Sequence, residues 1–155
     1  MNHALAAAKL AAAGTANPFV GTWTYRSYLN RPDVMVGDDA RKALDLVFGE
    51  GVITLKGDAN TLAGEIDMGQ GYVLDLTGSV KGAVGAVPAL ARIRGIGRAG
   101  TPTENWEYDY CGYLAWTWPD GVAQVPAIVG TVVRAKAHGS AKAGVVASFI
   151  AAKQP

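Results

Sequence analysis

Residues 89–110 read ALARIRGIGRAGTPTENWEYDY, two runs of alternating side chains on either side of a turn that contains glycine and proline. Strict alternation is typical of β-strands that have one buried and one wet face. A turn at residues 99–102 predicts a hairpin whose outer face pairs opposite charges, each pair stabilising the sheet by roughly 0.2–1 kcal/mol. These pairs are Arg94 with Glu107 and Arg92 with Asp109.

The other face of this hairpin carries aromatic rings opposite small residues. The expected pairs are Gly95 with Trp106, Ile93 with Tyr108 and Ala91 with Tyr110. A register error of one residue would exchange the two faces, so the alternation makes this face the inner one. Rings beside small neighbours can interdigitate and fill an interior, or leave an aromatic slot for a guest. Both outcomes remain open at this point.

The same alternation of apolar and polar side chains continues through most of the chain and predicts eight strands joined by short turns. Neighbouring strands should therefore pair antiparallel, and closing the last strand onto the first removes the exposed edges. We expect an all-β fold, an eight-stranded antiparallel up-and-down barrel spanning residues 18–155. A short N-terminal helix, within a helical extension over residues 1–17, should precede it. The predicted strands are 19–29, 44–56, 62–68, 72–81, 87–98, 103–118, 122–136 and 143–153.

Two further turns predict register. A loop at residues 69–71 pairs inward-facing residues such as Ile66 with Leu74, and it sets Glu65 opposite Asp75 outside, with Arg92 or Arg94 expected beside them. A loop at residues 119–121 has further consequences on the inner face. It pairs Tyr108 with Val132, Trp106 with Arg134 and Trp116 with Gln124, all inside.

Residues 19–23 read FVGTW, and a Gly-X-Trp that opens the first strand of such a barrel resembles the lipocalin and avidin-like group, the calycins. The segment Tyr108-Asp109-Tyr110 is similar to the Thr-Asp-Tyr motif of lipocalins. Arg134 lies late in the chain, where that family keeps an arginine packed on the first-strand tryptophan. The resemblance implies a barrel that holds small, largely apolar guests. Avidin-type biotin binding is not expected, because residues 122–153 contain neither Trp nor Asp.

Composition narrows the function classes. The net charge is +1 with acidic and basic residues interleaved, so neither nucleic acid nor a membrane surface is an expected partner. Cys111 has no intrachain partner, and the only histidines are His3 and His138, so neither a disulfide nor a metal site is predicted. No cofactor is predicted either: the glycines of residues 95–100 precede no helix, so they do not form a dinucleotide loop.

The N-terminal residues 1–14 are rich in alanine, but Lys9 interrupts the apolar run that a signal peptide requires. No run approaches the ~18 apolar residues of a membrane-spanning helix. These features predict a cytoplasmic location.

Arg134 is the one charged side chain that the predicted register turns inward. It could stack on Trp106 and bond to the barrel rim, or it could receive the anionic end of a ligand. We expect a binding site for a small, largely apolar or aromatic molecule with one polar or anionic end. The predicted ligand-binding residues are Tyr25, Ser27, Tyr72, Trp106, Tyr108, Tyr110 and Arg134.

Two alternatives remain. One is a cofactor-free isomerase, cyclase or decarboxylase in which Tyr108 or Tyr25 acts as general acid and Arg134 stabilises negative charge. The other is a structural or partner-binding barrel with a filled interior. A histidine or carboxylate near Arg134 would favour the enzyme, whereas the absence of a cavity above ~300 Å³ would favour the filled barrel.

Two surface features complete the prediction. The connection over residues 30–42 is long enough to be a lid over the end that holds Trp106 and Arg134. Residues 122–136 and 143–153 are apolar on both faces and need cover. Either the N-terminal helix docks on them or two barrels pack together there, and we favour the homodimer.

Overall fold

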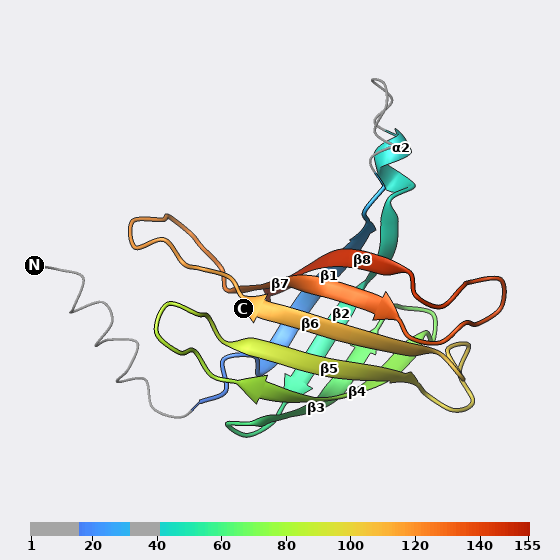
Figure 1. Cartoon of the computed structure of the whole chain (residues 1–155), viewed down its shortest axis with the longest axis horizontal. Coiled ribbons are helices and arrows are strands. Elements are labelled where there is room, and N and C mark those ends of the chain that lie inside the picture. The colour runs from blue at the N-terminus through green and yellow to red at the C-terminus, as the bar shows by residue number, and fades with distance from the viewer. Residues whose placement is uncertain (1–15, 32–40) are drawn as a thin grey trace, which may run out of the picture.

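The computed structural model describes residues 16–31 and 41–155, which form a closed barrel of eight antiparallel strands in sequence order (Figure 1). The predicted all-β, up-and-down barrel is therefore confirmed, including the pairing of the first strand with the last. The strands are β1 (Gly21–Leu29), β2 (Val47–Lys56), β3 (Thr61–Asp67), β4 (Val73–Lys81), β5 (Leu90–Gly97), β6 (Glu107–Leu114), β7 (Ala127–Arg134) and β8 (Val146–Lys153).

The predicted N-terminal helix and most of the predicted lid lie outside the described residues. The one helix in the described part is α2 (Arg41–Leu44), a single turn in the connection from β1 to β2 that the sequence did not predict. Within residues 16–31 and 41–155, no helix has the length and apolarity needed to cross a lipid bilayer.

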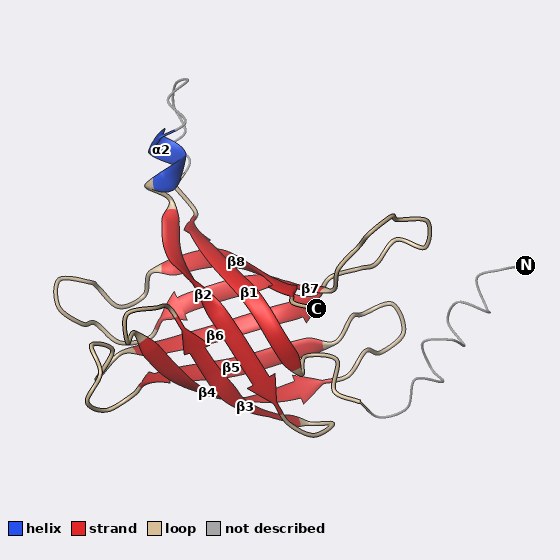
Figure 2. Cartoon of the chain, turned by 180° about the vertical axis from the view of Figure 1, so that it is seen from behind, coloured by secondary structure: helices blue, strands red, loops and turns tan. Residues whose placement is uncertain are grey.

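The two ends of the barrel differ in the connections they carry. The connections β1–β2, β3–β4, β5–β6 and β7–β8 lie at one end, which we call the mouth, and the other three connections lie at the opposite end, which we call the base. Figure 2 shows α2 extending from the ends of β1 and β2, with the two strands crossing in front of the others.

The inner and outer faces follow the predicted alternation. On β6, the even-numbered Tyr108, Tyr110 and Gly112 are buried, whereas Asp109 and Tyr113 are exposed. On β5 the arginines are exposed and the small residues face inward. The core consists of these inward side chains, and its largest fully buried member is Trp23.

The predicted β3–β4 register is confirmed, with Ile66 opposite Leu74. The β5–β6 and β6–β7 registers were wrong by two residues: Gly95 lies opposite Tyr108, and Tyr108 lies opposite Arg134. A shift of two residues keeps each side chain on its face but changes its neighbours.

The turn between β5 and β6 explains the first shift, because it is longer than the predicted turn at residues 99–102. It spans residues 98–106 and contains a local hydrogen bond from Trp106 N to Thr103 O at 2.8 Å. The Thr103 hydroxyl ties the turn to β4 by donating to Val73 O. Asn105 adopts a left-handed conformation with φ of 69°. Gly97 N then donates to Trp106 O at 2.8 Å, so Trp106 comes just before the strand.

The second shift arises in the same way. Residues 115–126 form the connection from β6 to β7, so the predicted strands 103–118 and 122–136 were too long. Trp116, predicted to face inward, is 71% exposed in this connection at the base.

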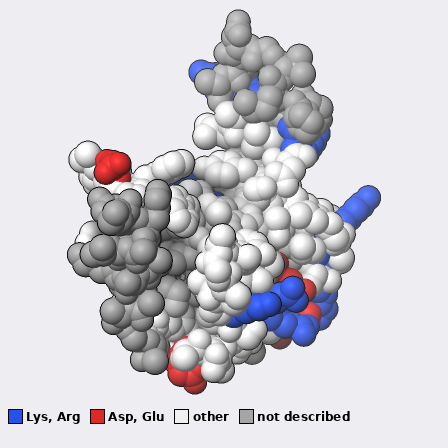
Figure 3. Space-filling model, turned by 60° about the vertical axis from the view of Figure 1, so that its left-hand side comes forward, with Lys and Arg blue, Asp and Glu red and all other residues white. Residues whose placement is uncertain are grey.

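The outer charges pair, though not as directly opposite partners. Arg94 lies opposite Asp109, and its Nη2 contacts the diagonal neighbour Glu107 Oε2 at 2.7 Å. The like-charged Glu65 and Asp75 do face each other, and Arg98, rather than Arg92 or Arg94, bridges them. Figure 3 shows one mixed group of blue and red side chains at the lower right, with other charged side chains scattered toward the edges of this view.

The base of the barrel is closed by side chains from the first residues of the domain. Trp23 and Phe19 are fully buried, and Trp23 Nε1 donates to Phe19 O at 2.9 Å. Lys153 Nζ lies 5.4 Å from the centre of the Trp23 ring. The cation on the first-strand tryptophan is therefore Lys153, and Arg134 lies at the mouth instead.

Candidate functional site

Aromatic and basic side chains from several elements meet at the mouth of the barrel. We call them the mouth cluster. Ring centres of neighbouring members lie 4.0–6.3 Å apart, so the cluster is continuous. Its members are Phe48, Tyr72, Trp106, Tyr108, Arg134 and His138.

Arg134 is the last residue of β7. The alternation of side chains along this strand turns Arg134 inward, directly opposite Tyr108. Its Nε donates to the Tyr108 hydroxyl oxygen at 3.1 Å, and its Nη1 donates to Lys142 O at 3.1 Å. The guanidinium carbon lies 4.9 Å from the centre of the Phe48 ring. Arg134 is thus held over an aromatic face, but the face is that of Phe48 and not the expected Trp106.

His138 lies in the connection between β7 and β8 and contacts two mouth aromatics. Its ring stacks on Trp106 with centres 4.0 Å apart and an angle of 14° between planes. Its Nε2 lies 2.9 Å from the Tyr108 hydroxyl oxygen. A short turn holds it there, since backbone hydrogen bonds join His138 and Ala141 in both directions.

The electrostatics of the mouth favour a neutral His138. Partial burial lowers the pKa of His138, and the positive charge of Arg134 lowers it further. Tyr108 is 7% exposed and lies between these two groups. The result is an ordered chain of three polar side chains at the edge of an apolar interior.

The other predicted site residues lie deeper and do not join this chain. The rings of Tyr25 and Tyr110 pack edge to face with centres 6.1 Å apart, and burial raises the pKa of both phenols. The fully buried Ser27 uses its hydroxyl to donate to Gly49 O at 3.2 Å. Of the predicted set, the structure therefore brings together Tyr72, Trp106, Tyr108 and Arg134 only.

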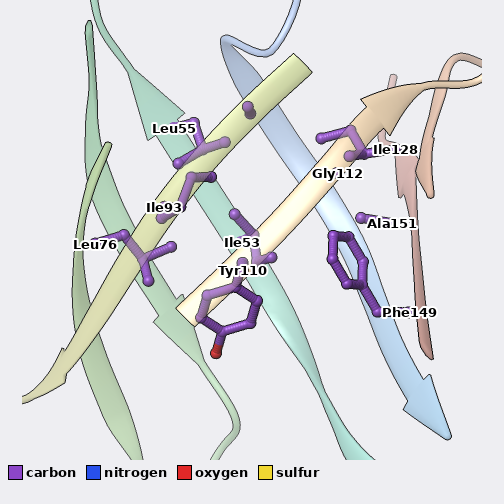
Figure 4. A pocket seen from close by; sticks show the side chains of 10 residues that line it. Ile53, Leu55, Leu76, Ile93, Tyr110, Gly112, Ile128, Phe149 and Ala151 are labelled. Atoms are coloured by element: carbon purple, nitrogen blue, oxygen red, sulfur yellow. The ribbon is translucent and has the colours of Figure 1, made fainter. Parts of the chain in front are cut away.

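The interior between the mouth and the base is nearly filled. Among the described residues, a cavity of about 20 Å³ lies in this interior, enough for about one water molecule. Figure 4 shows that aliphatic side chains and the rings of Tyr110 and Phe149 surround it. A void lined in this way should be dry. The rings beside small neighbours have thus interdigitated, which was one of the two outcomes left open above.

Sequence reasoning missed Phe48 and His138. Phe48 faces inward because the β1–β2 register shifts at Ser27 and Tyr28, where Tyr28 pairs with Val47 and Phe48 becomes an extra residue. Gly49 and Gly51 signal an irregular strand in the sequence but do not locate the shift. His138 lies outside a strand, where alternation gives no direction for a side chain.

Among residues 16–31 and 41–155, no group of three or more His, Cys, Asp or Glu side chains is arranged to hold a metal ion. Searches of protein-family models, curated proteins and solved structures found no match to this chain. The function of the mouth cluster therefore has to be inferred from its own geometry.

Proposed function

We propose that this protein binds a small molecule with an apolar body and one anionic end, and that the mouth cluster is the binding site. The observation that carries the proposal is the environment of Arg134. It is a half-buried cation that, within the described residues, has no carboxylate within 4.0 Å. A carboxylate bound there would form charge-assisted hydrogen bonds with the guanidinium.

The remaining donors of Arg134 are available for this role. Nε and Nη1 are bound to Tyr108 and Lys142, and the described part of the chain supplies no partner for Nη2. These two bonds fix the guanidinium plane, so less entropy is lost when a ligand binds.

Tyr72 and Trp106 supply the apolar wall. The Tyr72 ring lies 5.8 Å from that of Trp106 and is 37% exposed, so the pair presents an aromatic surface next to Arg134. A ligand body can lie on this surface while its anionic end contacts Arg134. Because the cavity below has only about 20 Å³, the proposed ligand rests at the mouth and does not occupy the depth of the barrel.

The filled interior also favours a second candidate function, a structural or partner-binding barrel. In this alternative Arg134, Tyr108 and His138 only stabilise the mouth. The calycin resemblance remains a proposal as well, supported by the barrel topology and by the buried Trp23 at the base.

The two functions are separated by titrating phenylacetate and its uncharged analogue phenylacetamide against tryptophan fluorescence. We expect phenylacetate to bind and Arg134→Met to weaken it on the order of tenfold or more, because a hydrogen bond to a charged group contributes ~1.5–3 kcal/mol. Arg92→Met is the matched control, since Arg92 is an exposed arginine on the outer face.

Equal affinity for the acid and the amide, or equal losses in the two arginine variants, would contradict the proposed role of Arg134. No binding of either compound would favour the filled barrel. Circular dichroism of each variant checks that the barrel is intact.

A further inference from the structure

We infer that the mouth cluster is also a proton-transfer site, in which Tyr108, coupled to His138 and Arg134, catalyses the enolisation of small 2-oxo acids. This inference rests on the proposed binding of an anion at Arg134. It goes further by assigning a reaction and a substrate class to the same residues.

The direction of the hydrogen bonds supports a relay. A guanidinium can only donate, so the Tyr108 oxygen accepts the bond from Arg134 Nε. When His138 is in the tautomer that leaves Nε2 without a proton, the Tyr108 hydroxyl donates to Nε2, 2.9 Å away. Tyr108 therefore has a proton acceptor on one side and a fixed positive charge on the other.

The two neighbours of Tyr108 can each take part in a proton transfer. Arg134 stabilises a developing phenolate, and neutral His138 can accept the proton. Three side chains from other elements face His138. They are Trp106, just before β6, Tyr108 on β6 and Arg134 on β7. Within the described residues, none of these contacts adds a carboxylate that would keep His138 protonated.

The reaction needs only a proton and no oxidant or cofactor. The Tyr108 oxygen takes the proton from the carbon next to the substrate carbonyl, while its own proton passes to His138 Nε2. The C–H electron pair becomes the C=C bond, and the carbonyl oxygen becomes an enolate beside Arg134. The proton then returns from His138 through Tyr108 to the enolate oxygen, or to the carbon in the reverse reaction, and both side chains are restored.

The substrate class follows from the same contacts. In a 2-oxo acid the carboxylate and the carbonyl are adjacent, so one guanidinium can contact oxygens of both groups. An aromatic substituent on the third carbon would lie against Tyr72 and Trp106. Phenylpyruvate is the simplest probe with these features.

The test follows deuterium exchange at carbon 3 of phenylpyruvate in D₂O by proton NMR. We expect the protein to accelerate exchange over buffer and Tyr108→Phe to reduce the acceleration on the order of 10²-fold or more, which is typical of lost acid–base catalysis. Tyr113→Phe is the matched control, because Tyr113 is an exposed residue of the same strand. It should exchange as fast as the unaltered protein.

His138 acts through Tyr108, so its test is a pH profile. The rate should fall at acid pH as His138 becomes protonated, with a midpoint below the ordinary histidine value of 6.5. His138→Gln should lose that acid limb along with most of the rate. An unchanged limb would show that His138 has no part in the transfer.

Binding is measured in parallel by tryptophan fluorescence. If phenylpyruvate binds but exchanges no faster than in buffer, or if Tyr108→Phe exchanges at the unaltered rate, the catalytic inference is overturned and the proposed binding function stands. If neither phenylpyruvate nor phenylacetate binds, both are overturned.

Discussion

Single residues set the geometry of the mouth, and Gly97 is the clearest case. It ends β5, and a Cβ built on it would lie 1.6 Å from Thr103 O and 3.1 Å from Trp106 N. The turn that carries Trp106 can approach β5 only because Gly97 has no side chain. The position of the tryptophan in the site thus depends on a glycine that does not belong to it.

Gly97→Ala should therefore destabilise the protein and displace Trp106. Because the contact is with backbone, we expect a loss of ~1–3 kcal/mol, the range of overpacked sites, measured by urea unfolding. Tryptophan fluorescence should shift as the stack with His138 opens. The control is Gly82→Ala, where a Cβ meets nothing within 4 Å. Equal stability of the two variants would contradict the close approach.

At this scale, sequence reasoning succeeded where a residue lies in a regular strand and failed where it does not. Arg134 and Tyr108 were placed inside by alternation alone. Phe48 sits at a register shift and His138 in a turn, so neither position follows from a period of two residues. His138, which the sequence did not place, is the residue that favours the catalytic hypothesis over simple binding.

At the scale of elements, strand faces were predictable and pairings less so. Alternation fixes the face of each residue, but the length of the connection fixes its partner. The β3–β4 connection was assigned correctly, and so was its register. The connections over residues 98–106 and 115–126 contain local hydrogen bonds, such as those from Trp106 N to Thr103 O and from Gly121 N to Trp118 O, which the strand pattern does not reveal.

The outer face of β7 and β8 supports the predicted homodimer as a continuing proposal. Their outward residues carry no charge, and the exposed Val129 and Ile150 are direct partners in the sheet. Tyr113 of β6 lies opposite Val129 and extends the apolar row. Such a row is suited to packing against a second copy of itself.

We expect light scattering at micromolar concentration to give twice the single-chain mass of 16.1 kDa. Ile150→Glu should give the single-chain mass, because it introduces a charge into the apolar row. Val52→Glu, a matched change on the outer face of β2, should remain dimeric. A single-chain mass for the unaltered protein would reject the dimer.

At the scale of the whole molecule, the sequence predicted that the sheet closes into a barrel, but it did not predict whether the interior is open or filled. Eight strands joined by short connections favour a closed up-and-down barrel, and the chain adopts this topology. Whether rings and small residues fill the interior depends on rotamers and on the two-residue shifts. Gly112, for example, opposes Ala91 where Tyr110 was expected.

The packed interior predicts a sensitivity to alkaline pH. Burial raises the pKa of Tyr25 and Tyr110 above the ordinary value of 10.0, so the unfolded chain loses these protons first. Above about pH 10 the unfolded state binds fewer protons, and the free energy of unfolding falls as pH rises. Urea unfolding between pH 8 and 11 should show this decline. It should be shallower in Tyr25→Phe and Tyr110→Phe and unaltered in the exposed-site control Tyr28→Phe.

The sealed base has a consequence for traffic through the protein. With Phe19 and Trp23 buried at one end, a ligand of the proposed kind would have to enter and leave at the opening beside Arg134. Entry and exit cannot proceed in single file from one side to the other.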